Sequence, residues 1–178
     1  MGILGSLFRR DRKTPKPSGL SFAVDLTRFR CNASSLAEVP GPEDGYYNLF
    51  DAGGAFYDPS AGIELGVSGA RLDYIHIALG QFAGDILADG RTIEVGANSR
   101  EADIASLFGP PYWRDDDDDE VILFYEDGRV ELQFEFPEKL TLGFITMSIT
   151  PIMANAKQRE AYGVSRSWPP TGPIFVNA

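Results

Sequence analysis

Short stretches in which apolar and polar residues alternate recur along this chain, and they predict half-buried β-strands. The clearest stretch is 130–136, where every second side chain is apolar and the residues between them are polar. Residues 20–26 mostly alternate as well, and 63–67 is expected to pair with 71–79 across a Ser-Gly turn. The pattern therefore predicts a series of antiparallel hairpins.

Turn-forming pairs mark where further strands meet. Asp89-Gly90 is expected to fold 86–95 back on itself, and Asp127-Gly128 joins an apolar strand at 121–125 to the strand at 130–136. The run 121–125 has no polar alternation, which predicts a strand covered on both faces. A further strand at 145–149 would complete a three-stranded meander.

Helical spacing is rarer. Asn98 followed by Glu101 forms a capping-box pattern before apolar residues at 104, 105, 107 and 108, which predicts a helix that Gly109 ends. Shorter helices are expected at 32–39 and 154–162, and two aromatic-rich strands at 46–57. The fold class is therefore α+β, a mainly antiparallel sheet of several hairpins with two or three short helices packed on it.

Charge divides the chain into two parts. The first 20 residues hold five Lys or Arg against one Asp, whereas the whole chain has a net charge of −10. We therefore expect a basic flexible tail and linker at 1–19 and a single α+β domain at 20–178. The tail begins with apolar side chains followed by cations, which could lie on an anionic membrane surface. The residues concerned are Ile3, Leu4, Leu7, Phe8, Arg9 and Arg10.

Composition limits the function classes. The negative net charge disfavours nucleic acid as a partner, because phosphate binding requires concentrated Lys and Arg. With one cysteine, Cys31, and one histidine, His76, the chain can form neither an internal disulfide framework nor a Cys/His zinc site. No apolar run is long enough to span a bilayer, and the cysteine usage suits the cytoplasm. We expect no cofactor.

The most unusual feature is an acidic run, Asp115, Asp116, Asp117, Asp118 and Asp119, followed by Glu120. Residues 94–138 hold fourteen acidic side chains against three arginines. Such a cluster could steer a basic protein partner, with Tyr112 and Trp113 as aromatic anchors. Two alternatives remain open: the run is a solvated loop, and the aromatics are a small satellite core.

Calcium binding is a further alternative for the acidic run. Asp115, Asp117, Asp119 and Glu126 have the spacing of an EF-hand loop, but Glu120 stands where the sharp turn requires Gly. We therefore expect no metal site.

Catalytic patterns are missing from the sequence. The stretch 66–70 lacks the last Gly of a nucleophile elbow, and His76 lies in a predicted strand, as expected for a packed or hydrogen-bonded histidine. Glu131 and Glu135 share one strand face, where alternation explains them as the wet side of the sheet. The pattern favours a protein without catalytic residues.

The run Phe108-Gly-Pro-Pro-Tyr-Trp-Arg-Asp-Asp-Asp117, continued by Glu120 to Glu126, resembles a family of uncharacterised bacterial proteins. The same is true of Gln158 to Val164 followed by Trp168-Pro-Pro. This resemblance covers about the last 85 residues and implies no activity. A helix ending in Leu-Phe-Gly-Pro before an acidic loop and a hairpin is also similar to immunity proteins of bacterial polymorphic toxin systems, which implies a cytoplasmic inhibitor that occludes a toxin.

These observations favour a non-enzymatic bacterial binding protein, immunity-like, that uses an acidic surface against a basic partner. The first alternative is a membrane-peripheral adaptor anchored at the inner face of the membrane through residues 1–13. The second is an enzyme of unrecognised type, which would require a pocket with converging carboxyl groups.

Overall fold

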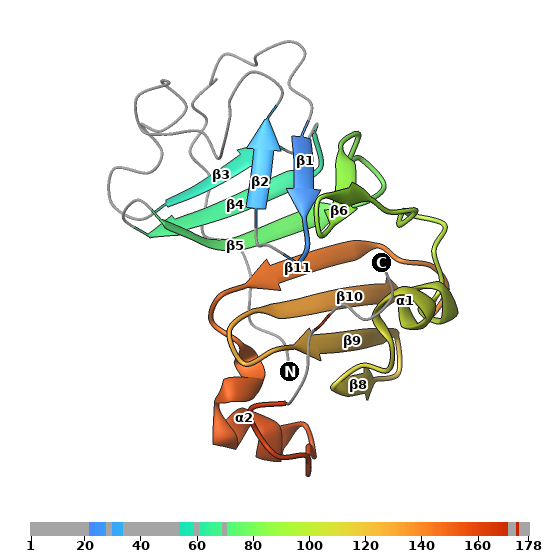
Figure 1. The fold of residues 1–178 in the computed structure, drawn as a ribbon. Coiled ribbons are helices and arrows are strands. Elements are labelled where there is room, and N and C mark those ends of the chain that lie inside the picture. The colour runs from blue at the N-terminus through green and yellow to red at the C-terminus, as the bar shows by residue number, and fades with distance from the viewer. Residues whose placement is uncertain are drawn as a thin grey trace.

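The computed structural model describes residues 22–27, 30–33, 54–58, 61–68, 71–170 and 174 (Figure 1). The strands form two β-sheets, with two short α-helices packed beside them. This arrangement confirms the predicted α+β class and its mainly antiparallel pairing. The predicted tail at 1–19 and the predicted strand at 46–50 lie outside the described residues.

The larger sheet has seven strands in the order β3-β4-β5-β11-β10-β9-β8, and every neighbouring pair is antiparallel. Its strands are β3 (Gly54–Asp58), β4 (Ile63–Ser68), β5 (Arg71–Ala78), β8 (Trp113–Asp116), β9 (Glu120–Glu126), β10 (Glu131–Pro137) and β11 (Phe144–Ser148). The meander predicted from 121 to 149 is confirmed as β9, β10 and β11. The strand order places β8 at one edge of this sheet.

The smaller sheet has the order β2-β1-β6-β7. Its strands are β1 (Phe22–Asp25), β2 (Arg30–Ala33), β6 (Asp85–Ala88) and β7 (Arg91–Thr92). The pairing of β1 with β6 is parallel, which the hairpin pattern did not predict, and Asp89-Gly90 forms the expected turn between β6 and β7. Because Asn32 and Ala33 end β2, the helix predicted from residue 32 is wrong at its start, and 34–39 lies outside the described residues.

Helix α1 (Glu101–Phe108) lies beside the large sheet, and its start corrects the predicted cap. Asp103 Oδ2 accepts a hydrogen bond of 2.8 Å from the backbone N–H of Arg100, so the N-cap is Arg100 rather than Asn98. A 3-10 turn, η2 (Ile152–Ala154), and helix α2 (Ala156–Ala161) follow β11. None of the helices in the described part of the chain is long and apolar enough to cross a membrane.

The main core lies between one face of the seven-stranded sheet, here the inner face, and the small sheet with α1. Alternating residues of β9, β10 and β11 supply its apolar side chains, and Ile104 and Phe108 of α1 close it from one side. The opposite, outer face of the same strands carries polar side chains as well as aromatic ones. That outer face and the β8 edge hold the candidate site.

Candidate functional site

The acidic run forms the tip of the β8–β9 hairpin. The backbone N–H of Asp117 donates to the carbonyl of Glu120 at 3.1 Å, and Asp117 Oδ1 accepts from the N–H of Asp118 at 2.7 Å. Asp is favourable in such turns because its side chain bonds to nearby backbone N–H groups. The side chains of Asp117, Asp118 and Asp119 are all exposed. Asp117, Asp118 and Asp119 therefore form a tight hairpin turn with their carboxylates in solvent.

Two cations, Arg114 and Lys139, form ion pairs with Asp116 in the β8 strand of this hairpin. Arg114 Nε lies 2.8 Å from Glu101 Oε2 and its guanidinium also binds Asp116, while Lys139 Nζ lies 2.7 Å from Asp116 Oδ1. Lys139 and then Arg114 lower the pKa of Asp116 to about 2. Asp116 is therefore committed to ion pairs within the chain. Asp117, Asp118 and Asp119 form no ion pair with any described residue.

The hairpin tip belongs to a larger feature, which we call the acidic end. Pro137 pairs with Glu120, so the turn after β10 lies beside the start of β9. The acidic end comprises five aspartates and three glutamates with two cations and one leucine: Asp115 to Asp119, Glu101, Glu120, Glu138, Arg114, Lys139 and Leu140. Carboxylates therefore dominate this end of the sheet.

Leu140 is the apolar member of the acidic end, and 65% of its surface is exposed. It follows Glu138 and Lys139, which have φ values of 55° and 56°, and its N–H donates to the carbonyl of Pro137 at 3.3 Å. Residues other than Gly and Asn are destabilised when their backbone adopts this left-handed conformation. The chain thus accepts backbone strain in a turn that displays a leucine in solvent.

Tyr112 and Trp113, the predicted aromatic anchors, lie at a small second core rather than on an open surface. Tyr112 is only 7% exposed, packs edge to face against Trp168 with centroids 5.9 Å apart, and donates to the carbonyl of Arg166 at 3.2 Å. Trp113 is partly buried, and its buried Nε1 has no hydrogen-bond partner among the described residues. Tyr112 is therefore part of a small satellite core, which was the alternative to its role as an aromatic anchor.

Residues 151–168, the C-terminal segment, cover the outer face of β9 and β10 and form that second core with it. Met153, Tyr162 and Trp168 of the segment pack with Phe124 of β9 and with Tyr112. Glu131, expected on the wet side of the sheet, is 1% exposed because this segment lies over it. The expectation for Glu131 is therefore wrong, and the cause is a cover supplied by a distant part of the chain.

Glu126 and Glu131 are directly paired across β9 and β10 beneath the C-terminal segment. Glu131 Oε2 accepts from the N–H of Ile152 at 2.8 Å, whereas neither carboxyl oxygen of Glu126 has a hydrogen-bond partner among the described residues. Burial, and then Coulomb repulsion by Glu131, raise the pKa of Glu126 to about 9. Among the described carboxyl groups of the outer face, Glu126 has the pKa that departs furthest from its ordinary value.

The rest of the outer face carries a polar network around the single histidine. His76 Nδ1 lies 2.9 Å from Thr146 Oγ1, which donates to Glu135 Oε1 at 3.2 Å, and Phe144 stacks on the imidazole with centroids 5.4 Å apart. The geometry fits an Nδ1–H that donates to Thr146. The prediction that His76 is packed and hydrogen-bonded is confirmed. Burial raises the pKa of Glu135, and His76 and Thr146 oppose that shift.

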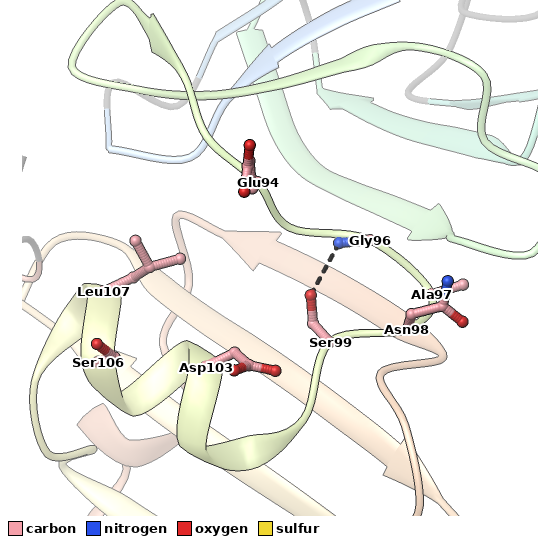
Figure 2. Close-up of a pocket in the computed structure, with 8 residues that line it drawn as sticks. All are labelled: Glu94, Gly96, Ala97, Asn98, Ser99, Asp103, Ser106 and Leu107. Carbon is pink, nitrogen blue, oxygen red and sulfur yellow. Dashed lines mark hydrogen bonds between the residues drawn. The ribbon is translucent and has the colours of Figure 1, made fainter.

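A cavity of about 530 Å³ lies between α1 and the loop that precedes it, and Figure 2 shows the residues that line it. It is lined by Glu94, Gly96, Ala97, Asn98, Ser99, Asp103, Ser106 and Leu107. Ser99 Oγ accepts from the N–H of Gly96 at 3.1 Å, and Asp103 is engaged at the helix cap. Two of its polar groups therefore already serve the local fold, and no cationic side chain lines the cavity.

The four residues of the calcium alternative are not brought together, because Asp115 lies in β8, Asp117 and Asp119 lie in the hairpin turn, and Glu126 lies at the far end of β9. Across the described residues, no group of three or more His, Cys, Asp or Glu side chains is arranged to hold a metal ion. The residues proposed to contact a membrane, Ile3, Leu4, Leu7, Phe8, Arg9 and Arg10, lie outside the described residues.

Comparison with known proteins found no family model, curated protein or solved structure that matches this chain. Function is therefore inferred from the geometry of the site. Two residues that matter in that geometry were not singled out from the sequence for these roles: Glu126 and Leu140. A charged residue directly after an apolar strand run marks Glu126, but no local sequence pattern marks Leu140.

Proposed function

We propose that this chain is a non-enzymatic binding protein whose acidic end receives a basic protein partner. The observation that carries the proposal is the contrast within one hairpin between Asp116, which is ion-paired, and its three exposed neighbours. Exposed carboxylates that form no ion pair with a cation of the described residues are available to an external one. Clustered like charge also speeds the approach of an oppositely charged protein by electrostatic steering.

Leu140 supports a protein as the partner rather than a small cation. A large apolar side chain that is mostly exposed and held in a strained turn fits an anchor that fills a pocket on another protein. A ring of charges around an apolar centre is the usual anatomy of a protein interface. The acidic end therefore combines steering charge with one candidate anchor.

The buried carboxyl pair does not favour the enzyme alternative. Glu126 and Glu131 converge and are perturbed, but the C-terminal segment covers both, and the cavity of Figure 2 lies at α1 rather than above them. A general acid has to reach a substrate within hydrogen-bond distance. An immunity-like inhibitor of a basic toxin is one form of the binding proposal, and the cross-linked partner's identity tests it.

The test is site-specific photo-cross-linking in the native cell. A photoreactive amino acid replaces Leu140, and the control carries it at Lys157, which is exposed on α2. We expect a protein rich in Lys and Arg to cross-link from position 140 and not from 157. Equal capture from both positions, or an acidic partner, would overturn the proposal.

With that partner purified, association kinetics separate steering from packing. Changing Asp117, Asp118 and Asp119 to Asn should lower the association rate about tenfold at low salt and leave dissociation nearly unchanged. Leu140→Ala should instead raise the dissociation rate. The matched control removes three charges elsewhere on exposed side chains, Asp85→Asn, Glu94→Gln and Glu160→Gln, and should have a much smaller effect on association.

A further inference from the structure

Glu131 holds the start of the C-terminal segment to the large sheet. The backbone N–H groups of Ile152 and Met153 donate to Glu131 Oε2 at 2.8 and 3.4 Å. Gln133 donates to the other oxygen of the same carboxylate. Figure 1 shows this segment, including α2, beside β9 and β10. Glu131 is therefore the anchor on which the start of the segment rests.

Glu126 sits next to this anchor, and no N–H or O–H group of the described residues donates to it. It is 5% exposed, and an ionised carboxylate buried without hydrogen bonds is strongly unfavourable. A second negative charge beside Glu131 adds repulsion. The packed arrangement therefore requires a proton on Glu126, as in other carboxyl pairs that share one site.

The other charged groups around the pair do not remove this requirement. Arg159 of α2 is a described cation that acts on Glu126 and lowers its pKa, but its side chain donates to the carbonyl of Met153 and lies 5.9 Å from the centroid of the Trp168 ring. Asp127, in the turn after β9, adds negative charge and binds Arg129. Tyr112 also lies close enough to Glu126 for an electrostatic interaction, and Arg166 Nη1 donates to the carbonyl of Tyr112 at 2.7 Å.

We propose that Glu126 and Glu131 form a proton-dependent latch for the C-terminal segment. With a proton on Glu126 the segment stays packed on β9 and β10. When that proton is lost, the segment lifts, both carboxylates become hydrated, and the aromatic side chains of the second core become exposed. The latch is independent of the partner proposed for the acidic end.

The sign and the pH window follow from linkage. The pKa of Glu126 is about 9 when the segment is packed and falls toward its ordinary value of 4.5 when the carboxyl group is hydrated. The packed state therefore binds the proton more tightly. The free energy that this difference contributes to packing is fully present only below the ordinary pKa of 4.5. Between the two values the opening equilibrium constant rises up to tenfold per pH unit, and above about 9 it rises no further.

Both tryptophans of the chain, Trp113 and Trp168, lie at the second core, so their fluorescence reports opening directly. The experiment measures acrylamide quenching of the full chain from pH 6 to 9.5, with far-UV circular dichroism to show that the sheets stay folded. The variants are Glu126→Gln, which keeps the shape without a titrating proton, and Glu138→Gln, which removes an exposed carboxylate.

We expect quenching of the wild type and of Glu138→Gln to rise several-fold across this range, while Glu126→Gln stays flat. In Glu131→Gln, which relieves the repulsion and so lowers the packed-state pKa of Glu126, the rise should be smaller and its upper end should shift to lower pH. A flat wild type, or a rise in Glu126→Gln equal to that of the wild type, would overturn the latch. If Glu126→Gln fails to fold, the direction of the shift in Glu131→Gln decides the matter by itself.

Discussion

Gly128 lies directly against Pro169, so that a Cβ atom on Gly128 would be 2.8 Å from Pro169 Cβ. Gly128 has a φ of +84° and forms the turn between β9 and β10, while Pro169 follows the C-terminal segment. The end of that segment therefore closes over a turn that only glycine fits without strain. The contact ties the segment to the sheet at a point away from Glu126 and Glu131.

Replacing Gly128 with Ala should loosen the C-terminal segment. The added methyl group meets Pro169 and also places a Cβ in the left-handed region, which alone costs about 1–2 kcal/mol. Gly163→Ala is the matched control, because Gly163 has a φ of +66° but no atom within 4 Å of an added Cβ. Hydrogen exchange of the amides at 151–168 should quicken more in Gly128→Ala than in Gly163→Ala. Equal exchange would mean that the Pro169 contact contributes nothing.

Gly66 should resist substitution for a different reason. Its Cβ would lie 2.0 Å from Cε1 of Tyr74, whose ring covers it and whose hydroxyl donates to Glu64. Gly66→Ala should therefore displace the ring, break that hydrogen bond and destabilise the chain by about 1–3 kcal/mol, the usual cost of overpacking. In a Tyr74→Ala background the same change should be nearly neutral. Chemical denaturation of the four variants forms the cycle, and an equal cost in both backgrounds would contradict the contact.

Acid should weaken the hairpin through Asp116. Its folded-state pKa of about 2 lies below the ordinary value of 3.8, so its ion pairs stabilise the fold above 3.8 and lose that effect as the pH falls through about 2. The difference in unfolding midpoint between wild type and Asp116→Asn should thus shrink as the pH falls from 6 to 2. Asp118→Asn is the control, since it removes the same charge from the same hairpin without breaking an ion pair with a described residue. A pH-independent difference would contradict the assignment.

Local patterns predicted the strands of this fold well because alternation reports directly on which face is buried. The alternation at 130–136 identified β10 and its apolar face, and the turn pairs Asp89-Gly90 and Asp127-Gly128 were located correctly. Glu131 was misplaced because its cover, Met153, lies 22 residues further along the chain. Alternation distinguishes the two faces of a strand but does not reveal what a distant segment places on them.

The helix cap shows a second limit of local patterns. Asn98 and Glu101 have capping-box spacing, yet the backbone starts the helix two residues later, where Asp103 meets the N–H of Arg100. Two overlapping patterns of similar quality compete, and tertiary packing selects one of them.

At the acidic end, composition alone identified the concentration of charge. The ion pairs that neutralise Asp116, and the exposure of Leu140, depend on how β8, α1 and the turn after β10 meet in space.

Burial of apolar side chains should stabilise the packing of α1 far more than its surface ion pairs do. Ile104 is fully buried in the main core, and Ile104→Ala should cost about 2–5 kcal/mol because it leaves a cavity. Arg114 joins α1 to β8 through Glu101, but its side chain is 40% exposed, and pairs of this kind contribute at most about 1 kcal/mol. Arg114→Gln should therefore shift the urea midpoint only slightly, and less again in 1 M salt, whereas the Ile104→Ala effect should persist in salt. A loss in Arg114→Gln as large as that in Ile104→Ala would show that the ion pairs, rather than the core, hold the helix.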